Sequence, residues 1–176
     1  NTLDDFLNYA ITQGVAPEVM SFLRDRPDML HKFEGGSEIK PFPSPRSWFA
    51  VSDGLELDLQ QADRVEMIKG DIGDEAAIMF EPHLRLYETM PRIDDILSGK
   101  NVQVPDDLSV VYCVAMGLAV RIDADNFDNA WKFIKQMKGD IQTLVMKLAY
   151  KRDTSISRSG AFTEWAVANA GAFSNV

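Results

Sequence analysis

The stretch FDNAWKFIKQMKGDIQTLVMKL, residues 127–148, decides the fold class of this chain. Its apolar residues recur at the spacing that places them on one face of a helix. The first such face is formed by Phe127, Ala130, Trp131, Ile134 and Met137. After Gly139 a second face follows, formed by Ile141, Leu144, Val145 and Leu148. The stretch therefore predicts two consecutive amphipathic helices.

The same periodicity extends over nearly the whole chain and predicts an all-α fold of about nine or ten helices. The most apolar segment, residues 108–120, contains β-branched residues that are also common in strands, but its length without a turn signal favours a buried helix. We expect residues 70–77 to interrupt a helix. We also expect Pro82 to kink or split the next helix, because proline cannot donate a backbone hydrogen bond. At 176 residues the chain is expected to form one domain, or two small helical subdomains packed as one unit.

The segment FPSPRSW, residues 42–48, predicts the start of a helix. Ser44 is a good N-cap residue, and Pro45 suits the first helical position. Trp48 then begins an inward apolar stripe. Arg46 falls in the first turn, where the residues alone leave two roles open. It either pairs with one of the many acidic side chains or meets an anionic ligand.

Composition and charge exclude several classes of protein. The 176 residues carry a formal charge of −9, from 18 basic and 27 acidic residues, which argues against binding to nucleic acid or to an anionic membrane. The only basic cluster, residues 151–158, is typical of a solvated loop. No apolar segment approaches the roughly 20 residues that cross a bilayer. The single cysteine, Cys113, is expected in the core and fits a cytoplasmic protein. Because the chain begins at Asn1, we expect it to be a piece of a longer protein.

The motifs of catalytic and metal sites are missing, so we assign no catalytic and no metal-binding residue. The sequence has no zinc spacing of Cys and His, no H-E-x-x-H and no G-x-S-x-G. The segment SGKN, residues 98–101, lacks the first glycine of a phosphate loop and is interpreted as a helix C-cap. The acidic segment RIDADNFDN, residues 121–129, lacks the glycine and the final glutamate of a calcium loop. We expect Asp123 or Asp125 to cap a helix there instead.

Four segments, taken in order, resemble the C-terminal helical region of MoxR-like AAA+ ATPases of bacterial or phage type. VMSFLRDRPDMLHKF (residues 19–33) resembles a helix pair of that family, and FPSPRSW resembles the start of its sensor-2 helix. IKGDIGDEAAIMF (residues 68–80) and MPRIDDILSGKNVQVPDDLSVVYCVAMGLA (residues 90–119) resemble its later helices. The resemblance runs from about Pro17 to the last tryptophan and departs from the family at Pro82.

The resemblance implies that residues 1–70 form a lid-like subdomain and that residues 71–176 extend it. Arg46 would be the sensor-2 arginine, which reaches the terminal phosphate of ATP bound with magnesium on the core domain of the full-length protein. The isolated chain would then not be catalytic. Its partners would be that core domain, neighbouring subunits of a ring, and an unknown protein substrate that the ATPase remodels. The alternative is a stand-alone helical interaction or adaptor module that binds no nucleotide.

Overall fold

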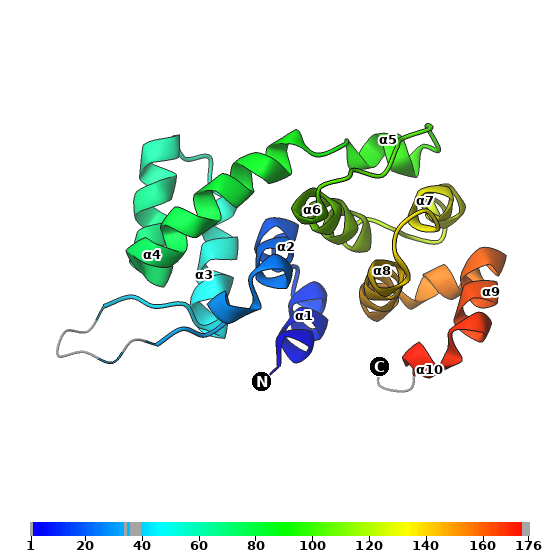
Figure 1. The fold of residues 1–176 in the computed structure, drawn as a ribbon, viewed down its shortest axis with the longest axis horizontal. Coiled ribbons are helices and arrows are strands. Elements are labelled where there is room, and N and C mark those ends of the chain that lie inside the picture. Colours follow the sequence, from blue (N-terminus) through cyan, green and yellow to red (C-terminus); the bar gives the residue numbers. More distant parts are fainter. Residues whose placement is uncertain (1, 34, 36–39, 174–176) are drawn as a thin grey trace. The chain divides into compact units, whose positions relative to one another are not determined.

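A computed structural model describes residues 2–33, 35 and 40–173 of the chain. These residues form helices, turns and loops, and none of them lies in a strand (Figure 1). The all-α prediction is therefore confirmed. The α-helices are α1 Leu3–Thr12, α2 Pro17–Asp25, α3 Pro45–Leu55, α4 Gln61–Thr89, α5 Ile93–Leu97, α6 Leu108–Ala119, α7 Phe127–Ile134, α8 Gly139–Arg152, α9 Gly160–Ala168 and α10 Ala170–Phe173. Two 3₁₀ segments, η1 Pro27–Met29 and η2 Thr154–Arg158, complete them.

The chain forms two compact units, Asn1–Thr89 and Met90–Val176. This division differs from the boundary after Gly70 that the sequence suggested. The reason lies in α4, which runs on past Gly70 and contributes Ile72 and Phe80 to the buried residues of the first unit. The first unit therefore includes about twenty residues more than the lid-like subdomain 1–70 that the resemblance implied.

Helix α4 consists of two arms that meet at a sharp angle (Figure 1). Only Gly73 has a non-helical backbone, with φ 82° and ψ 164°, which confirms the interruption expected within residues 70–77. The carbonyl oxygen of Pro41 lies so close to Gly73 that a Cβ there would approach it to 2.5 Å. A glycine is required on both counts, because side chains disfavour this φ and the Pro41 backbone fills the space.

Of the two outcomes expected at Pro82, a kink or a split of the helix, the split does not occur. The second arm of α4 remains helical through Pro82, although proline removes one hydrogen bond to the carbonyl of Ile78. Pro82 and Ile78 both lie on the exposed side of the arm. Water can therefore solvate the carbonyl that has lost its partner, as on the outer face of many curved helices.

The core of the first unit is aromatic. The rings of Phe22, Trp48 and Phe80 contact one another, with centroids 5.0 to 5.4 Å apart, and all three side chains are buried. They come from α2, α3 and α4, so this cluster fixes the three helices against one another. Edge-to-face pairs of this kind add to the stabilisation that burial alone provides.

The second unit has a core built around α6 that mixes aliphatic and aromatic side chains, among them the buried Phe127, Phe162 and Trp165. Helix α6 packs against α8, α5 packs against α7, and α9 follows through η2 (Figure 1). The prediction of a buried helix in residues 108–120 is confirmed, since α6 is almost entirely buried and Cys113 has no exposed surface. The stretch 127–148 forms α7 and α8 as predicted. No helix in the described part of the chain is long and apolar enough to span a bilayer.

Candidate functional site

The first turn of α3 is held by a reciprocal cap. The Ser44 hydroxyl oxygen accepts a hydrogen bond from the Ser47 backbone N–H at 3.2 Å, and the Ser47 hydroxyl oxygen accepts one from the Ser44 N–H at 2.8 Å. Pro45 occupies the first helical position, as predicted. Both hydrogen bonds of this capping box satisfy backbone N–H groups that have no partner within the helix. The backbone that carries Arg46 is therefore well defined.

Trp48 anchors the same turn to the core. Its side chain is fully buried, and its indole N–H donates to the carbonyl of Met29 at 2.8 Å. A buried indole N–H needs such an acceptor, so the bond determines how α3 lies on the segment that follows α2. Arg46, two residues earlier, consequently has a fixed place on the surface.

Arg46 is exposed and forms no ion pair with any residue that the structure describes. Nearby cations differ in this respect. The Lys32 ammonium contacts the Glu75 carboxylate at 2.7 Å, and the Arg26 guanidinium lies 3.5 Å from Asp28. Of the two roles left open above, the ion pair with an acid is thus not observed within the described residues.

Exposed aromatic side chains lie beside this helix start. The Phe33 and Phe42 rings are 5.1 Å apart, and the His31 ring lies 6.0 Å from that of Phe42. A hydrogen bond of 3.1 Å from the Ser47 hydroxyl to the Phe42 carbonyl joins them to the first turn of α3. Phe33 is 65% exposed, so this edge combines apolar rings with the Arg46 cation.

A buried polar pair links α2 to α4. The Ser21 hydroxyl lies 2.7 Å from His83 Nε2, and it also donates to the Glu18 carbonyl at 3.0 Å. Burial lowers the pKa of His83, although the negative charge of Asp25 opposes the shift. A serine beside a histidine is the pair used for nucleophilic attack, but Ser21 has no exposed surface and already donates its proton to a backbone carbonyl. The pair is therefore structural.

A second polar group joins the two arms of α4. The Arg64 guanidinium contacts Glu81 at 3.1 Å and Glu88 at 3.7 Å, and the Gln61 amide donates to Glu81 at 3.3 Å. Burial raises the pKa of the nearby Glu18 carboxyl, and the charge of Glu88 adds to the shift. Because Arg64 precedes Gly73 and its partners follow it, these contacts hold the sharp angle of α4.

The other motifs considered above have structural roles. Ser98 and Gly99 end α5, with Gly99 at φ 82°, as the C-cap interpretation of SGKN predicted. The expectation that Asp123 or Asp125 caps a helix is wrong, because the N-cap of α7 is Asn126, which makes no side-chain cap hydrogen bond. Asp123 instead accepts hydrogen bonds from the Asp125 and Asn126 N–H groups and so stabilises the turn before α7. Within the described residues no three His, Cys, Asp or Glu side chains are grouped so that they could hold a metal ion.

The basic cluster 151–158 is not the solvated loop that we expected. Arg152 ends α8 and is half-buried, and its guanidinium donates to the carbonyls of Ala119 and Ile122 at the end of α6. Residues 154–158 then form η2, whose Ile156 is buried. The sequence did not predict this role of Arg152. The last carbonyls of a helix lack partners within that helix, but nothing in the sequence indicates which distant side chain will bind them.

Comparisons of the chain with family models, with curated proteins and with solved structures found no significant match. The resemblance to MoxR-like ATPases stays a prediction. The geometry around Arg46 and the cavity described below are the observations from which a function can be argued.

Proposed function

We propose that the first unit is the lid-like subdomain of a MoxR-like AAA+ ATPase and that Arg46 contacts the terminal phosphate of bound ATP. The observation that carries the proposal is the state of Arg46. It is exposed, it lacks an acidic partner among the described residues, and it lies on a turn held by a reciprocal cap. In a chain of formal charge −9, an arginine without such a partner is available to an external anion.

The chemistry of Arg46 suits a phosphate. A guanidinium keeps its charge at physiological pH and offers a planar set of N–H donors that matches phosphate oxygens. Its position on the first turn of α3 adds the partial positive charge of a helix N-terminus. A cation placed in this way stabilises the negative charge that develops as the phosphoryl group is transferred.

The remainder of the proposed site belongs to another domain of the full-length protein. The phosphate loop and the acids that bind magnesium would lie on that core domain, and neighbouring subunits of a ring would complete the assembly. For this reason we expect the chain Asn1–Val176 by itself to bind ATP weakly or not at all. Calorimetric titration with ATP measures this, and a micromolar dissociation constant for the isolated chain would contradict the proposal.

The decisive experiment is the substitution Arg46→Ala in the full-length protein. Removal of an arginine that stabilises the transferred phosphate lowers turnover by about three orders of magnitude or more. Arg46→Lys keeps the charge without the planar fork and is expected to restore only part of the activity. Arg85→Ala is the matched control, because Arg85 is also exposed and lies in the same unit. An unchanged rate of ATP hydrolysis in Arg46→Ala, with circular dichroism unaltered, would refute the role.

A second function, that of a stand-alone interaction module, is favoured by a different observation. The second unit carries an open cavity with an apolar floor, and the exposed Leu108 stands at its rim. Exposed apolar side chains also occur in the first unit at Tyr9, Leu57 and Ile78. If the full-length protein has no nucleotide-binding core, the role of an interaction module replaces that of an ATPase lid.

A further inference from the structure

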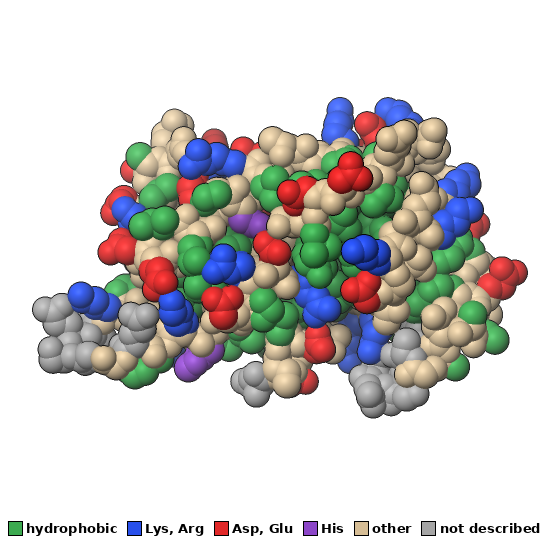
Figure 2. Space-filling model, in the orientation of Figure 1, with side chains coloured by type: hydrophobic (Ala, Val, Ile, Leu, Met, Phe, Trp, Pro, Cys, Tyr) green, Lys and Arg blue, Asp and Glu red, His purple; other side chains and the backbone are tan. Residues whose placement is uncertain are grey.

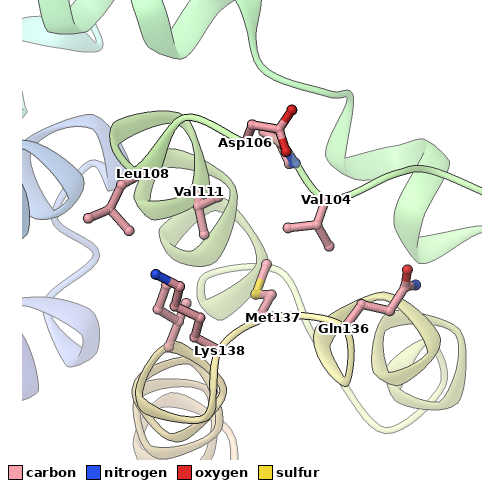
Figure 3. A pocket seen from close by; sticks show the side chains of 9 residues that line it. Val104, Asp106, Leu108, Val111, Gln136, Met137 and Lys138 are labelled. Atoms are coloured by element: carbon pink, nitrogen blue, oxygen red, sulfur yellow. The ribbon is translucent and has the colours of Figure 1, made fainter.

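A cavity of about 310 Å³ lies in the second unit between the start of α6 and the corner that joins α7 to α8 (Figure 3). Its floor is apolar, because Val111, Met137 and Ile141 line it and are only 6%, 5% and 2% exposed. Leu108 stands at its rim and is 46% exposed. The volume is at the lower end of the range found for ligand pockets in proteins.

The walls of the cavity are held in place by local hydrogen bonds. On one side the Asp107 carboxylate caps α6 by accepting from the Ser109 N–H at 2.8 Å. On the other side the Gln142 amide donates to the carbonyls of Met137 and Lys135 at 2.8 and 3.2 Å. These bonds fix the start of α6 and the α7–α8 corner, which border the cavity.

The charges around the cavity are arranged unevenly. Lys138 and Asp106 stand on opposite sides of it (Figure 3). Two more exposed lysines precede Lys138 at intervals of three residues, Lys135 at the C-cap of α7 and Lys132 within that helix, and Figure 2 shows basic side chains over α7. Lys138 and Lys135 have no acidic partner among the described residues, and Lys132 contacts the Asn129 amide oxygen at 3.1 Å. We call Lys132, Lys135 and Lys138 the lysine row.

We propose that this cavity binds a large apolar side chain of a partner polypeptide whose neighbouring residues are acidic. The apolar side chain would fill the space between Leu108 and Met137, and the carboxylates beside it would lie along the lysine row. Such a row is unusual in a chain with 27 acidic residues, and it is complementary to an acidic segment. On the opposite side of the cavity Asp106 would repel the acidic residues of the partner segment, so the segment can bind in one direction only. The inference does not depend on Arg46 or on nucleotide.

The expected affinity has an apolar and an electrostatic contribution. Burial of a leucine-sized side chain in the cavity raises the binding constant about tenfold to a hundredfold. Each exposed pair between a lysine and a carboxylate adds only a small factor, roughly twofold to fivefold, which salt reduces. The segment is therefore expected to bind reversibly, and both the apolar and the acidic parts are needed.

The test uses the whole chain and a fluorescein-labelled short peptide with a central leucine followed by aspartates and glutamates. Fluorescence anisotropy is expected to show saturable binding that weakens with salt. Leu108→Glu and Lys138→Glu are each expected to lower the affinity about tenfold or more. Both substitutions place an acid at a helix start, where it favours folding.

Matched controls separate the cavity from general effects of charge. Val167→Glu adds the same charge as Leu108→Glu, at a residue of α9 that is 75% exposed and does not line the cavity, so binding is expected to stay unchanged. A second peptide with alanine in place of leucine is expected to bind about tenfold more weakly. The proposal is overturned if the wild-type chain does not bind the leucine peptide, or if Leu108→Glu binds it as well as the wild type does. Equal affinity for the leucine and alanine peptides would overturn it as well.

Discussion

The substitution Ser21→Ala is expected to destabilise the first unit by about 1–3 kcal/mol, which is the cost of depriving a buried polar group of its partner. The Ser21 hydroxyl donates to the Glu18 carbonyl at 3.0 Å, so toward His83 it acts as an acceptor for Nε2–H at 2.7 Å. Both residues are buried, with exposed fractions of 0% and 6%, and alanine offers no acceptor in place of the hydroxyl. For a chain of this size a loss of 1 kcal/mol lowers the melting temperature by about 2–4 °C.

The same pair makes the stability of the first unit depend on pH. Burial lowers the pKa of His83 below the usual histidine value of about 6.5, so the folded state binds fewer protons than the unfolded state as pH falls through this range. Neutral His83 contributes fully to the free energy of unfolding above about pH 6.5. Below that pH the contribution is lost by at most about 1.4 kcal/mol per pH unit. Glu18 acts in the opposite direction, because burial raises its pKa and protonation relieves its buried charge.

The assay must report on the first unit alone. In a urea titration the NMR signal of the Trp48 indole N–H, which donates to the Met29 carbonyl, gives the folded fraction of that unit directly. Comparison of the wild type with His83→Gln at pH 8 and pH 5 isolates the titration of His83 from that of Glu18. Equal losses of stability in both proteins between these pH values would refute the role of His83. A Ser21→Ala variant as stable as the wild type would refute the hydrogen bond.

Three further substitutions test the geometry of α4. Gly73→Ala is expected to destabilise the first unit by about 1–3 kcal/mol, because the alanine must adopt φ 82° and its Cβ meets the Pro41 carbonyl. Gly70→Ala, where no atom lies within 4 Å of the new Cβ, is expected instead to stabilise it by about 0.5–1 kcal/mol in the same urea titration. Pro82→Ala is expected to raise the melting temperature of the first unit in calorimetry, since it restores a hydrogen bond to the Ile78 carbonyl. A lower melting temperature would mean that the proline is required for the path of the second arm.

Much of the local structure was predictable because its causes are local. The Thr2–Asp5 capping box, Pro17 and Pro45 at first helical positions, and Ser44 as a cap follow from neighbouring residues alone. Apolar spacing likewise predicted α7 and α8. Even at the candidate site, the sequence indicated the helix start and the place of Arg46 within it.

The partners of buried polar residues were not predictable. Ser21 and His83 are 62 positions apart, and Arg152 donates to carbonyls 30 and 33 positions earlier. No pattern in the sequence connects such residues, because their contact depends on how the helices pack. The cavity beside Leu108 was not predictable for the same reason, since its walls come from α6, α8 and the corner before α8.

The sequence by itself determined where helices start, which faces are apolar, and that the chain is all-α, because capping and periodicity act over a few residues. Tertiary structure alone decided the limits of the two units, the sharp angle between the two arms of α4, and the availability of Arg46. Gly73 illustrates the difference. Its type allows a positive φ, but the Pro41 carbonyl, 32 positions away in the chain, is what requires a glycine there.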